Sequence, residues 1–202
     1  MRITAGIYGG RIIQAMPSKT TRPTTSRVKE AWASSVGSFM PKGSIEGARV
    51  LDAFAGSGSL GLELLSRGAE SCLFIERDRR AAKILKENIK SLGLTARQAK
   101  VSVSDSLSHK ILEGARGTGP FDIVVLDPPY STELKQVTEL LSTLAAAQLL
   151  AEPCLISYEH AAEATDELPS TLESLNNEKQ WTLQLVRRKK YGTICIDYYK
   201  AN

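Results

Sequence analysis

The central part of this chain, from Val50 to about Glu159, alternates short apolar runs with longer segments of helical periodicity. Strands that are each followed by a helix pair in parallel, because the helix returns the chain to the same edge of the sheet before the next strand begins. The alternation therefore predicts a doubly wound α/β sheet with helices on both faces. The expected strands are 49–52, 71–75, 99–103, 121–126 and 154–158.

The C-terminal part predicts an antiparallel end to this sheet. Trp181–Lys190 and Thr193–Tyr199 are strand-like and flank Tyr191-Gly192, where the glycine permits a tight hairpin turn. Together with the five parallel strands, this hairpin predicts a seven-stranded, mostly parallel sheet. We expect the polar segment 161–179 to form loop and helix.

Residues 1–25 form a basic, glycine-rich extension ahead of the sheet. Gly9-Gly10 lies between two short apolar stretches, which predicts a small hairpin. A helix is expected over Ser26–Phe39, with Ser26 as its N-cap because serine oxygens accept hydrogen bonds from the first free N–H groups. A length of 202 residues suits one core, so we expect a single domain over residues 1–202.

The strand 121–126 ends in Asp127-Pro128-Pro129-Tyr130, an unusual sequence for the centre of a sheet. The first proline restricts Asp127 to extended geometry, and neither proline has an N–H, so the turn presents carbonyl and carboxylate oxygens as acceptors. Tyr130 adds a flat ring. Acceptors for amine hydrogens beside a stacking ring suit a planar base that carries an exocyclic NH2. The structural alternative is a proline-rich turn after a buried strand.

A second motif joins the strand 49–52 to the next helix. Asp52-Ala53-Phe54-Ala55-Gly56-Ser57-Gly58 is rich in small residues that permit a sharp turn and close approach of a ligand to the backbone. The following strand ends in Glu76-Arg77, and an acid in that position can bind both hydroxyls of a ribose. These residues predict a nucleotide-like cofactor. A glycine turn without a ligand is the alternative.

Two cofactors fit these residues. Gly56-x-Gly58-x-x-Gly61, with Glu76 about twenty residues on, matches the dinucleotide fingerprint of NAD enzymes. In that fingerprint, however, the first glycine follows the strand directly, so that a helix N-terminus meets the pyrophosphate. Here Asp52 and three further residues intervene, and a carboxylate repels a pyrophosphate. A carboxylate suits the amino group of S-adenosylmethionine, so we favour S-adenosylmethionine over NAD.

The third expected strand is followed by Ser104-Asp105-Ser106. In folds of this kind the loop lies beside the adenine, and Asp105 would accept a hydrogen bond from its amino group. An Asx turn that caps the residues from Leu107 onward is an equal alternative. The candidate cofactor-binding residues are Asp52, Ala53, Phe54, Gly56, Ser57, Gly58, Glu76, Arg77, Asp105 and Ser106, and the candidate catalytic residues are Asp127, Pro128, Pro129 and Tyr130.

These motifs together resemble a class I methyltransferase, with a Rossmann-like fold, that acts on an exocyclic amine. The segment Thr21–Ala31 is similar to the R-P-T-x-x-R-V-R-E-A segment of the bacterial 16S ribosomal RNA (guanine-966-N2)-methyltransferase family, and the opening Arg2–Arg11 also resembles that family's start. The resemblance covers nearly the whole chain. This chain departs from the family pattern at Ala5-Gly6, where the family has a glycine pair, and at Trp32-Ala33-Ser34, where it has Leu-Phe-Asn.

The resemblance implies S-adenosylmethionine-dependent methylation of the N2 amine of one guanine in 16S rRNA, within a small-subunit particle. It further implies a cytoplasmic monomer that needs no metal and no membrane. Asp-Pro-Pro-Tyr also serves adenine N6, so an adenine-N6 methyltransferase acting on DNA or RNA stays open. A non-catalytic RNA-binding factor of ribosome assembly is the alternative from another class.

The charge distribution agrees with an RNA substrate. The net charge is +4 with a pI of about 9.0, and the stretch from Arg2 to Arg27 holds five basic residues and no acid. Basic arms of this kind neutralise phosphates, although an ordinary solvated face would look the same. The candidate RNA-binding residues are Arg2, Arg11, Arg22, Thr24, Arg27, Arg187, Arg188, Lys189 and Lys190.

The remaining reactive residues predict no further chemistry. Cys72, Cys154 and Cys195 lie in expected strands without C-x-x-C spacing, which is typical of reduced core residues in a cytosolic protein. No cluster with metal-ligand spacing occurs, and the opening residues contain no apolar core of a signal peptide. No apolar run reaches the roughly 18 residues that a membrane helix needs.

Overall fold

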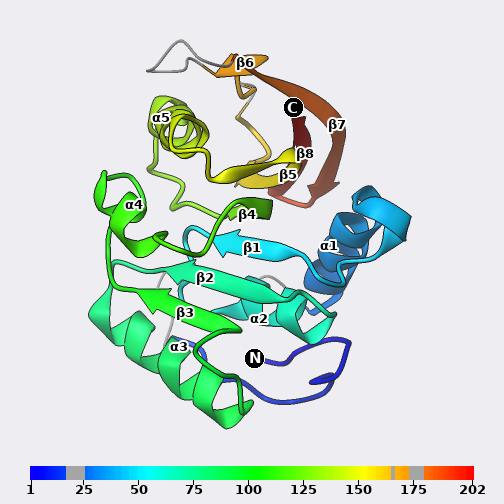
Figure 1. Cartoon of the computed structure of the whole chain (residues 1–202). Coiled ribbons are helices and arrows are strands. Elements are labelled where there is room, and N and C mark those ends of the chain that lie inside the picture. The colour runs from blue at the N-terminus through cyan, green and yellow to red at the C-terminus, as the bar shows by residue number, and fades with distance from the viewer. Residues whose placement is uncertain (17–25, 165–166, 173–179) are drawn as a thin grey trace.

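The computed structural model describes residues 1–16, 26–164, 167–172 and 180–202. In these residues eight strands form one sheet in the order β3-β2-β1-β4-β5-β8-β7-β6 (Figure 1). The strands are β1 Arg49–Asp52, β2 Ser71–Ile75, β3 Ala99–Ser102, β4 Phe121–Leu126, β5 Leu150–Ala161, β6 Thr171–Leu172, β7 Trp181–Tyr191 and β8 Ile194–Ala201. The helices are α1 Ser26–Phe39, α2 Ser59–Ser66, α3 Arg79–Ser91, α4 Lys110–Gly114 and α5 Leu134–Ala146, with a 3-10 turn η1 at Pro41–Gly43.

Strands β1 to β5 pair in parallel, which confirms the predicted doubly wound sheet. The order β3-β2-β1-β4-β5 changes direction between β1 and β4. At such a switch point the connections leave the sheet on opposite sides, and the crevice that opens at the carboxyl ends of the strands is where ligands bind in open α/β sheets. The loops after β1, β2 and β4, which carry the predicted site residues, meet at this crevice.

Apolar side chains fill both faces of the sheet. One face packs against α1, α2, α3 and the N-terminal extension, and the other packs against α4 and α5. Successive residues of β1, Val50 and Leu51, belong to the two different cores, as the alternation of side chains along a strand requires. This burial on both faces explains why the central strands are continuous apolar runs in the sequence.

The C-terminal end of the sheet is antiparallel, as predicted. β8 pairs with both β5 and β7, and Gly192 lies in the turn between β7 and β8 with a φ of +64°. The expected count of seven strands is one too low, because Thr171–Leu172 pairs with Trp181 and Thr182 of β7 as a short edge strand. The expectation of helix in 161–179 is wrong for the described residues of that segment, while residues 165–166 and 173–179 lie outside them.

The N-terminal extension folds back on itself and onto α2. Arg2 pairs with Ile12 in an isolated antiparallel bridge, and the chain turns between them through Gly6–Gly10. Ile3 and Ile13 are buried in the core that α1, α2 and α3 share. The extension is thereby part of the same hydrophobic core as the sheet.

Helix α1 has the expected bounds, but Ser26 is its first helical residue rather than its N-cap. The cap position, residue 25, lies outside the described residues. All three cysteines are buried free thiols in β2, β5 and β8, as predicted. Among the helices of the described ranges, none has the length and apolarity needed to cross a membrane.

Candidate active site

The loop after β1 depends on glycines for its close packing. Gly58 precedes α2 with a φ of +87°, and a Cβ atom there would lie 2.3 Å from Leu85 of α3. At Gly61 a Cβ atom would lie 2.3 Å from the ring of Phe74. The glycine pattern therefore lets α2 and α3 approach the sheet closely, which brings the loop backbone to the carboxyl ends of β1 and β2.

Asp52 lies beneath this loop at the end of β1. The N–H of Gly61 donates a hydrogen bond to its Oδ2 at 3.0 Å, while its Oδ1 is buried and has no hydrogen-bond partner among the described residues. Burial raises the pKa of Asp52 to about 7, and the neighbouring carboxylates Asp127 and Glu76 add to the effect. A buried acceptor without a donor suits a ligand that brings its own N–H groups or positive charge.

Glu76 connects the loops after β1 and β2. Its Oε2 accepts a hydrogen bond from the N–H of Gly56 at 2.7 Å, and its Oε1 accepts one from the N–H of Asp78 at 2.6 Å. Each carboxylate oxygen can accept a second hydrogen bond. Glu76 is thus held in place by two backbone donors and keeps acceptor capacity for a pair of hydroxyl groups.

A cavity of about 300 Å³ brings most of the predicted cofactor residues together. That volume is at the lower end of the range for small-molecule sites. Of the predicted residues, Asp52, Ser57 and Gly58 do not line it. Its lining comes from all three loops and from the turn after β4: Ala53, Phe54, Gly56, Ile75, Glu76, Arg77, Ser104, Asp105, Ser106, Leu107, Pro129 and Thr132.

The loop after β3 forms the expected Asx turn and also reaches the cavity. The Oδ1 of Asp105 accepts a hydrogen bond from the N–H of Leu107 at 3.0 Å, which is the Asx turn, and Asp105 also lines the cavity. The hydroxyl of Ser106 donates to the carbonyl oxygen of Ala53 and so ties this loop to the loop after β1.

The N-terminal extension also supports the loop after β1, through Asn88 of α3. The side-chain amide of Asn88 donates to the carbonyl oxygens of Ser57 and Gln14, each at 2.9 Å, and its Oδ1 accepts from the N–H of Gln14 at 2.8 Å. One buried side chain therefore joins the extension to the predicted cofactor loop. The sequence analysis did not identify this residue.

The Asp-Pro-Pro-Tyr turn lies directly after β4, beside the cavity. Asp127 is partly buried, and burial raises its pKa to about 6. Pro128 is buried and Pro129 lines the cavity. Tyr130 is 68% exposed, so its ring is free to contact a large ligand. The turn thus places an acidic acceptor and an accessible aromatic ring next to the cofactor cavity.

Glu159 is a site residue that the sequence analysis missed. It lies near the end of β5, next to Asp127. Burial and the charge of Asp127 together raise its pKa to about 8. The strand was expected to end at Tyr158, so Glu159 was not assigned to it. The sequence did offer one sign of a site residue here, because Glu159 is an acid directly after an apolar strand, as Asp127 is.

Trp32 of α1 covers the pair of carboxylates from one side. Its Nε1 donates to the hydroxyl of Ser157 at 2.8 Å, and both residues line a narrow crevice with Asp127 and Glu159. Trp32 stands where the resembling family has leucine, so here the indole bond fixes α1 against β5. The first helix of the chain thereby forms a wall of the candidate active site.

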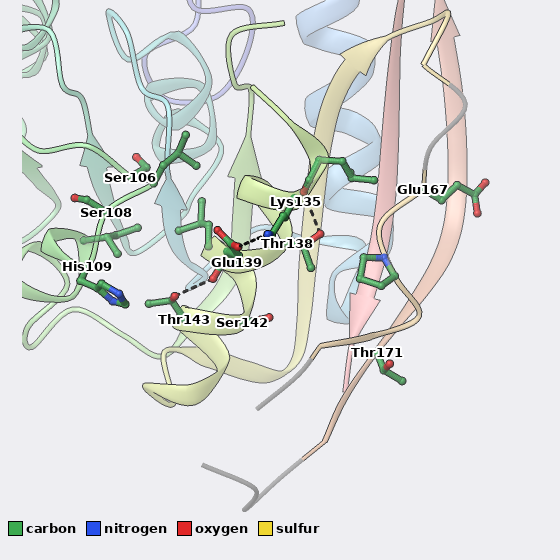
Figure 2. Close-up of a pocket in the computed structure, with 15 residues that line it drawn as sticks. Ser106, Ser108, His109, Lys135, Thr138, Glu139, Ser142, Thr143, Glu167 and Thr171 are labelled. Atoms are coloured by element: carbon green, nitrogen blue, oxygen red, sulfur yellow. Dashed lines mark hydrogen bonds and ion pairs between the residues drawn. The ribbon is translucent and has the colours of Figure 1, made fainter. Parts of the chain in front are cut away.

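A larger cavity, of about 900 Å³, lies elsewhere, between α4, α5 and the segment 167–171 (Figure 2). Figure 2 shows Lys135 and Thr143 beside Glu139, with an ion pair at 3.9 Å and a hydrogen bond from the Thr143 hydroxyl to the Glu139 carbonyl oxygen at 2.8 Å. This cavity shares Ser106 and Leu107 with the smaller one but contains no residue of 52–58 or 127–130. The smaller cavity is the better candidate because the motifs converge on it.

The described N-terminal basic residues belong to the extension, or, in the case of Arg27, to the start of α1. Arg2 and Arg27 are exposed, and the exposed Arg11 donates to the carbonyl oxygen of Ser91 at 2.8 Å. Arg22 and Thr24 lie outside the described residues.

The C-terminal basic residues on β7 have partners of different kinds. Arg188 binds the buried Asp197 with two hydrogen bonds of 2.7 and 2.6 Å. The Arg187 guanidinium lies 5.6 Å from the centre of the Phe39 ring, and the Lys189 ammonium donates to the Ser35 hydroxyl at 2.7 Å. Lys190 is exposed. The guanidinium of Arg188 therefore compensates a buried charge, whereas Arg187 and Lys190 are exposed and Lys189 is partly buried.

Among residues 1–16, 26–164, 167–172 and 180–202, no group of three or more histidine, cysteine, aspartate or glutamate side chains is arranged to hold a metal ion.

Comparison with known proteins places this geometry in a family. Residues 1–200 match the family described as "Conserved hypothetical protein 95". The chain is 34% identical over 203 residues to ribosomal RNA small subunit methyltransferase D of Haemophilus influenzae, covering 99% of this chain and 93% of that one, and 35% identical over 200 residues to the Escherichia coli protein of the same name, covering 95% and 92%.

A solved structure described as "Putative methyltransferase yhhF from Escherichia coli" matches with a TM-score of 0.74 at 30% identity, over 99% of this chain and 97% of that one. The chain therefore belongs to the Conserved hypothetical protein 95 family, together with the small-subunit methyltransferase D proteins, and has the class I methyltransferase fold.

Proposed function

We propose that this protein transfers the methyl group of S-adenosylmethionine to the N2 amine of one guanine in 16S rRNA. The observation that carries the proposal is the position of the Asp127 turn, whose Pro129 borders the cavity formed by the loops after β1, β2 and β3. An amine acceptor site thus adjoins a nucleoside-sized site. The names of the relatives support ribosomal RNA of the small subunit as the substrate.

The charges around the cavity support S-adenosylmethionine over a dinucleotide. Asp52, Glu76 and Asp127 follow or end three neighbouring strands, and among the described residues that line the cavity Arg77 is the one cation. Three carboxylates repel a pyrophosphate and attract a cationic ligand. In this proposal Glu76 binds the ribose hydroxyls, Asp105 binds the adenine, and Asp52 supports the loop that faces the methionine end. When bound, the cofactor supplies a methyl group that its sulfonium charge has already activated.

The residues after β4 act on the acceptor amine. The N2 lone pair of guanine is delocalised into the ring, which makes it a poor nucleophile. Asp127 and the carbonyl oxygen of Pro128 accept the two amine hydrogens, direct the lone pair towards the methyl group and stabilise the positive charge that develops during attack. Tyr130 holds the base by stacking. In-line placement of the two reacting atoms contributes much of the rate. Methyl transfer gives an N-methylammonium group, which is acidic and releases its extra proton to solvent.

The RNA reaches this site in a form whose base edges are accessible. Single-stranded loops present such edges, and a stacked base must first be extruded. We assign phosphate contacts to the acid-free N-terminal segment with Arg2, Arg11, Arg22, Thr24 and Arg27, and to Arg187, Lys189 and Lys190 on β7. The proposed substrate is a small-subunit particle in the cytoplasm, and the proposed active form is a monomer.

The test is methyl transfer to small subunits from a strain that lacks the endogenous enzyme. Labelled S-adenosylmethionine and the purified protein are incubated with the subunits, and the RNA is digested to nucleosides. We expect label in N2-methylguanosine. Asp127→Ala should slow transfer by about 10²–10³-fold, the typical loss for one preorganised polar contact at a reacting centre, with cofactor affinity nearly unchanged.

Label in N6-methyladenosine would replace the assignment of the base. Binding of the cofactor without transfer to any RNA would support the non-catalytic alternative. Near-normal turnover by Asp127→Ala would remove the proposed site.

A further inference from the structure

The geometry points to Glu159 as a specificity-determining residue: its carboxylate accepts the hydrogen on N1 of the target guanine, while Asp127 accepts from the N2 amine. This inference rests on the guanine-N2 function proposed above and deepens it. The Asp-Pro-Pro-Tyr turn recognises an NH2 group, which guanine and adenine both carry. A second acceptor beside it is what separates the two bases.

The sheet register places the two carboxylates side by side. Leu126 of β4 pairs with Tyr158 of β5, so Asp127 and Glu159 are the next residues on two neighbouring parallel chains. Neighbouring strands are about 4.8 Å apart, and in-register side chains project from the same face. Both side chains line the crevice that also contains Trp32. The two acceptors are therefore on one side of the sheet, where β5 runs beside β4 next to the switch point.

Within the part of the chain that the structure describes, neither carboxylate has a hydrogen-bond or ion-pair partner. No described residue donates a hydrogen bond to the side chain of Asp127 or Glu159, and none forms a salt bridge with it. Three further titratable groups interact electrostatically with Asp127 or Glu159. They are Asp52 of β1, Tyr130 of the turn and Tyr198 of β8. None of these is a cation. Two acceptors held together without a donor are costly unless a ligand supplies the donors.

Guanine supplies donors in the matching arrangement. Its Watson–Crick edge carries N1–H next to the N2 amine, so two adjacent donors meet two adjacent acceptors. Adenine carries an acceptor at N1 next to its N6 amine, and that acceptor would face the Glu159 carboxylate. Where Glu159 carries a proton in the free protein, guanine binding releases that proton to solvent, so that carboxylate oxygens face the N1–H donor.

The decisive probe is 2-aminopurine, which keeps the 2-amine but has an acceptor at N1 in place of N1–H. Small subunits are reconstituted with 16S RNA that carries either guanine or 2-aminopurine at the target nucleotide. The ratio of kcat/KM for the two substrates is measured for the wild-type protein and for Glu159→Gln. The glutamine is isosteric and, unlike a carboxylate, offers an N–H to the N1 acceptor of 2-aminopurine.

We expect the wild-type protein to prefer guanine, and Glu159→Gln to lower this preference by about 10–100-fold, the range for one well-placed base contact. Glu159→Asp should transfer more slowly yet keep the preference, because it retains a carboxylate. Glu113→Gln, at an exposed position of α4, is the matched control and should leave the ratio unchanged. A purely structural role for Glu159 would lower both rates equally.

The outcomes separate this inference from the function on which it rests. If the wild-type protein places no label on guanine N2, the proposed function fails and Glu159 has no guanine to select. If the wild-type protein does methylate guanine N2 but Glu159→Gln keeps the full preference over 2-aminopurine, the proposed function stands and the role of Glu159 is wrong.

Discussion

At the scale of single residues, the distinctive feature of the candidate site is a set of buried or partly buried carboxylates. Asp52, Asp127 and Glu159 all have raised pKa values, and burial is the main cause for each. Natural proteins retain uncompensated buried acids chiefly where they do chemistry or bind a ligand. By contrast, the buried Asp197 is paired with Arg188 and belongs to the scaffold. The buried acids thus form two groups. Asp197 is paired within the fold, whereas we expect Asp52, Asp127 and Glu159 to be paired by a bound ligand.

The unpaired acids predict a specific dependence of stability on pH. The folded-state pKa of Glu159, about 8, is above its ordinary value, so its contribution to stability is fully present below about pH 4.5 and is lost as pH rises through 8. Glu159→Gln should therefore gain stability over the wild-type protein with rising pH. Each kcal/mol of relieved repulsion should raise the melting temperature by about 2–4 °C.

The measurement is a pair of melting curves at pH 5 and pH 8.5 without cofactor. Glu113→Gln serves again as the control, since Glu113 is exposed and should show the same difference from wild type at both pH values. A Glu159→Gln difference that does not change with pH would contradict the buried, repelled state of this acid.

At the scale of elements, the N-terminal extension is joined to the sheet domain through one buried glutamate. Glu63 of α2 is fully buried and accepts hydrogen bonds from the backbone N–H groups of Thr4 and Ala5, at 2.8 and 3.2 Å. It also pairs with Arg67 at 2.9 Å and with the buried Lys29 at 3.4 Å. The extension, α1 and α2 therefore meet at a single carboxylate, which satisfies donors from all three.

This arrangement predicts that the two ends of the buried ion pair are not equivalent. Glu63→Ala leaves the Lys29 ammonium buried without its counter-ion and should cost about 3–5 kcal/mol of unfolding free energy. Lys29→Met should cost less than half as much, because Glu63 keeps Arg67 and the donors of Thr4 and Ala5. Urea unfolding at neutral pH measures both. Equal losses would show that the ion pair itself, rather than the cluster of donors, holds the extension.

At the scale of the whole molecule, the sheet order determines where the site forms. The change of direction between β1 and β4 brings together loops that are far apart in the sequence, and the cavity takes residues from positions 53 to 132. Helix α1 and β5 then close the amine side through Trp32 and Glu159. Cofactor and acceptor sites therefore share one edge of a single sheet.

A ligand that fills this edge should stabilise the entire domain. S-adenosylmethionine or its demethylated product, at one hundred times its dissociation constant, should add about 2.7 kcal/mol of stability. That corresponds to a rise of about 5–10 °C in the melting temperature. Glu76→Ala should reduce the rise by weakening the ribose contact, and NAD should have no effect. A rise with NAD and none with S-adenosylmethionine would overturn the interpretation of residues 52–58.

Most strands and helices, and the two motif-bearing turns, could be predicted from the sequence alone, although the short strand β6 could not. Apolar runs and helical periodicity predicted the parallel strands, and Tyr191-Gly192 predicted the C-terminal hairpin, because these patterns depend on neighbours along the chain. The motifs at 52–58 and 127–130 are equally local. Glycine conformation and proline geometry act over a few residues, so both turns were identifiable before any contact was known.

Contacts between elements that are distant in the sequence became visible only in the folded structure. Glu159 became a partner of Asp127 through the β4–β5 register, and Trp32 became a wall of the site through its bond to Ser157. The Asn88 bridge and the short edge strand β6 likewise depend on pairing partners distant in sequence. Such contacts arise from packing between elements, and a local sequence pattern does not specify how distant elements align with one another. The reaction class was thus predictable from short motifs, whereas the selectivity proposed for Glu159 depends on the register between β4 and β5.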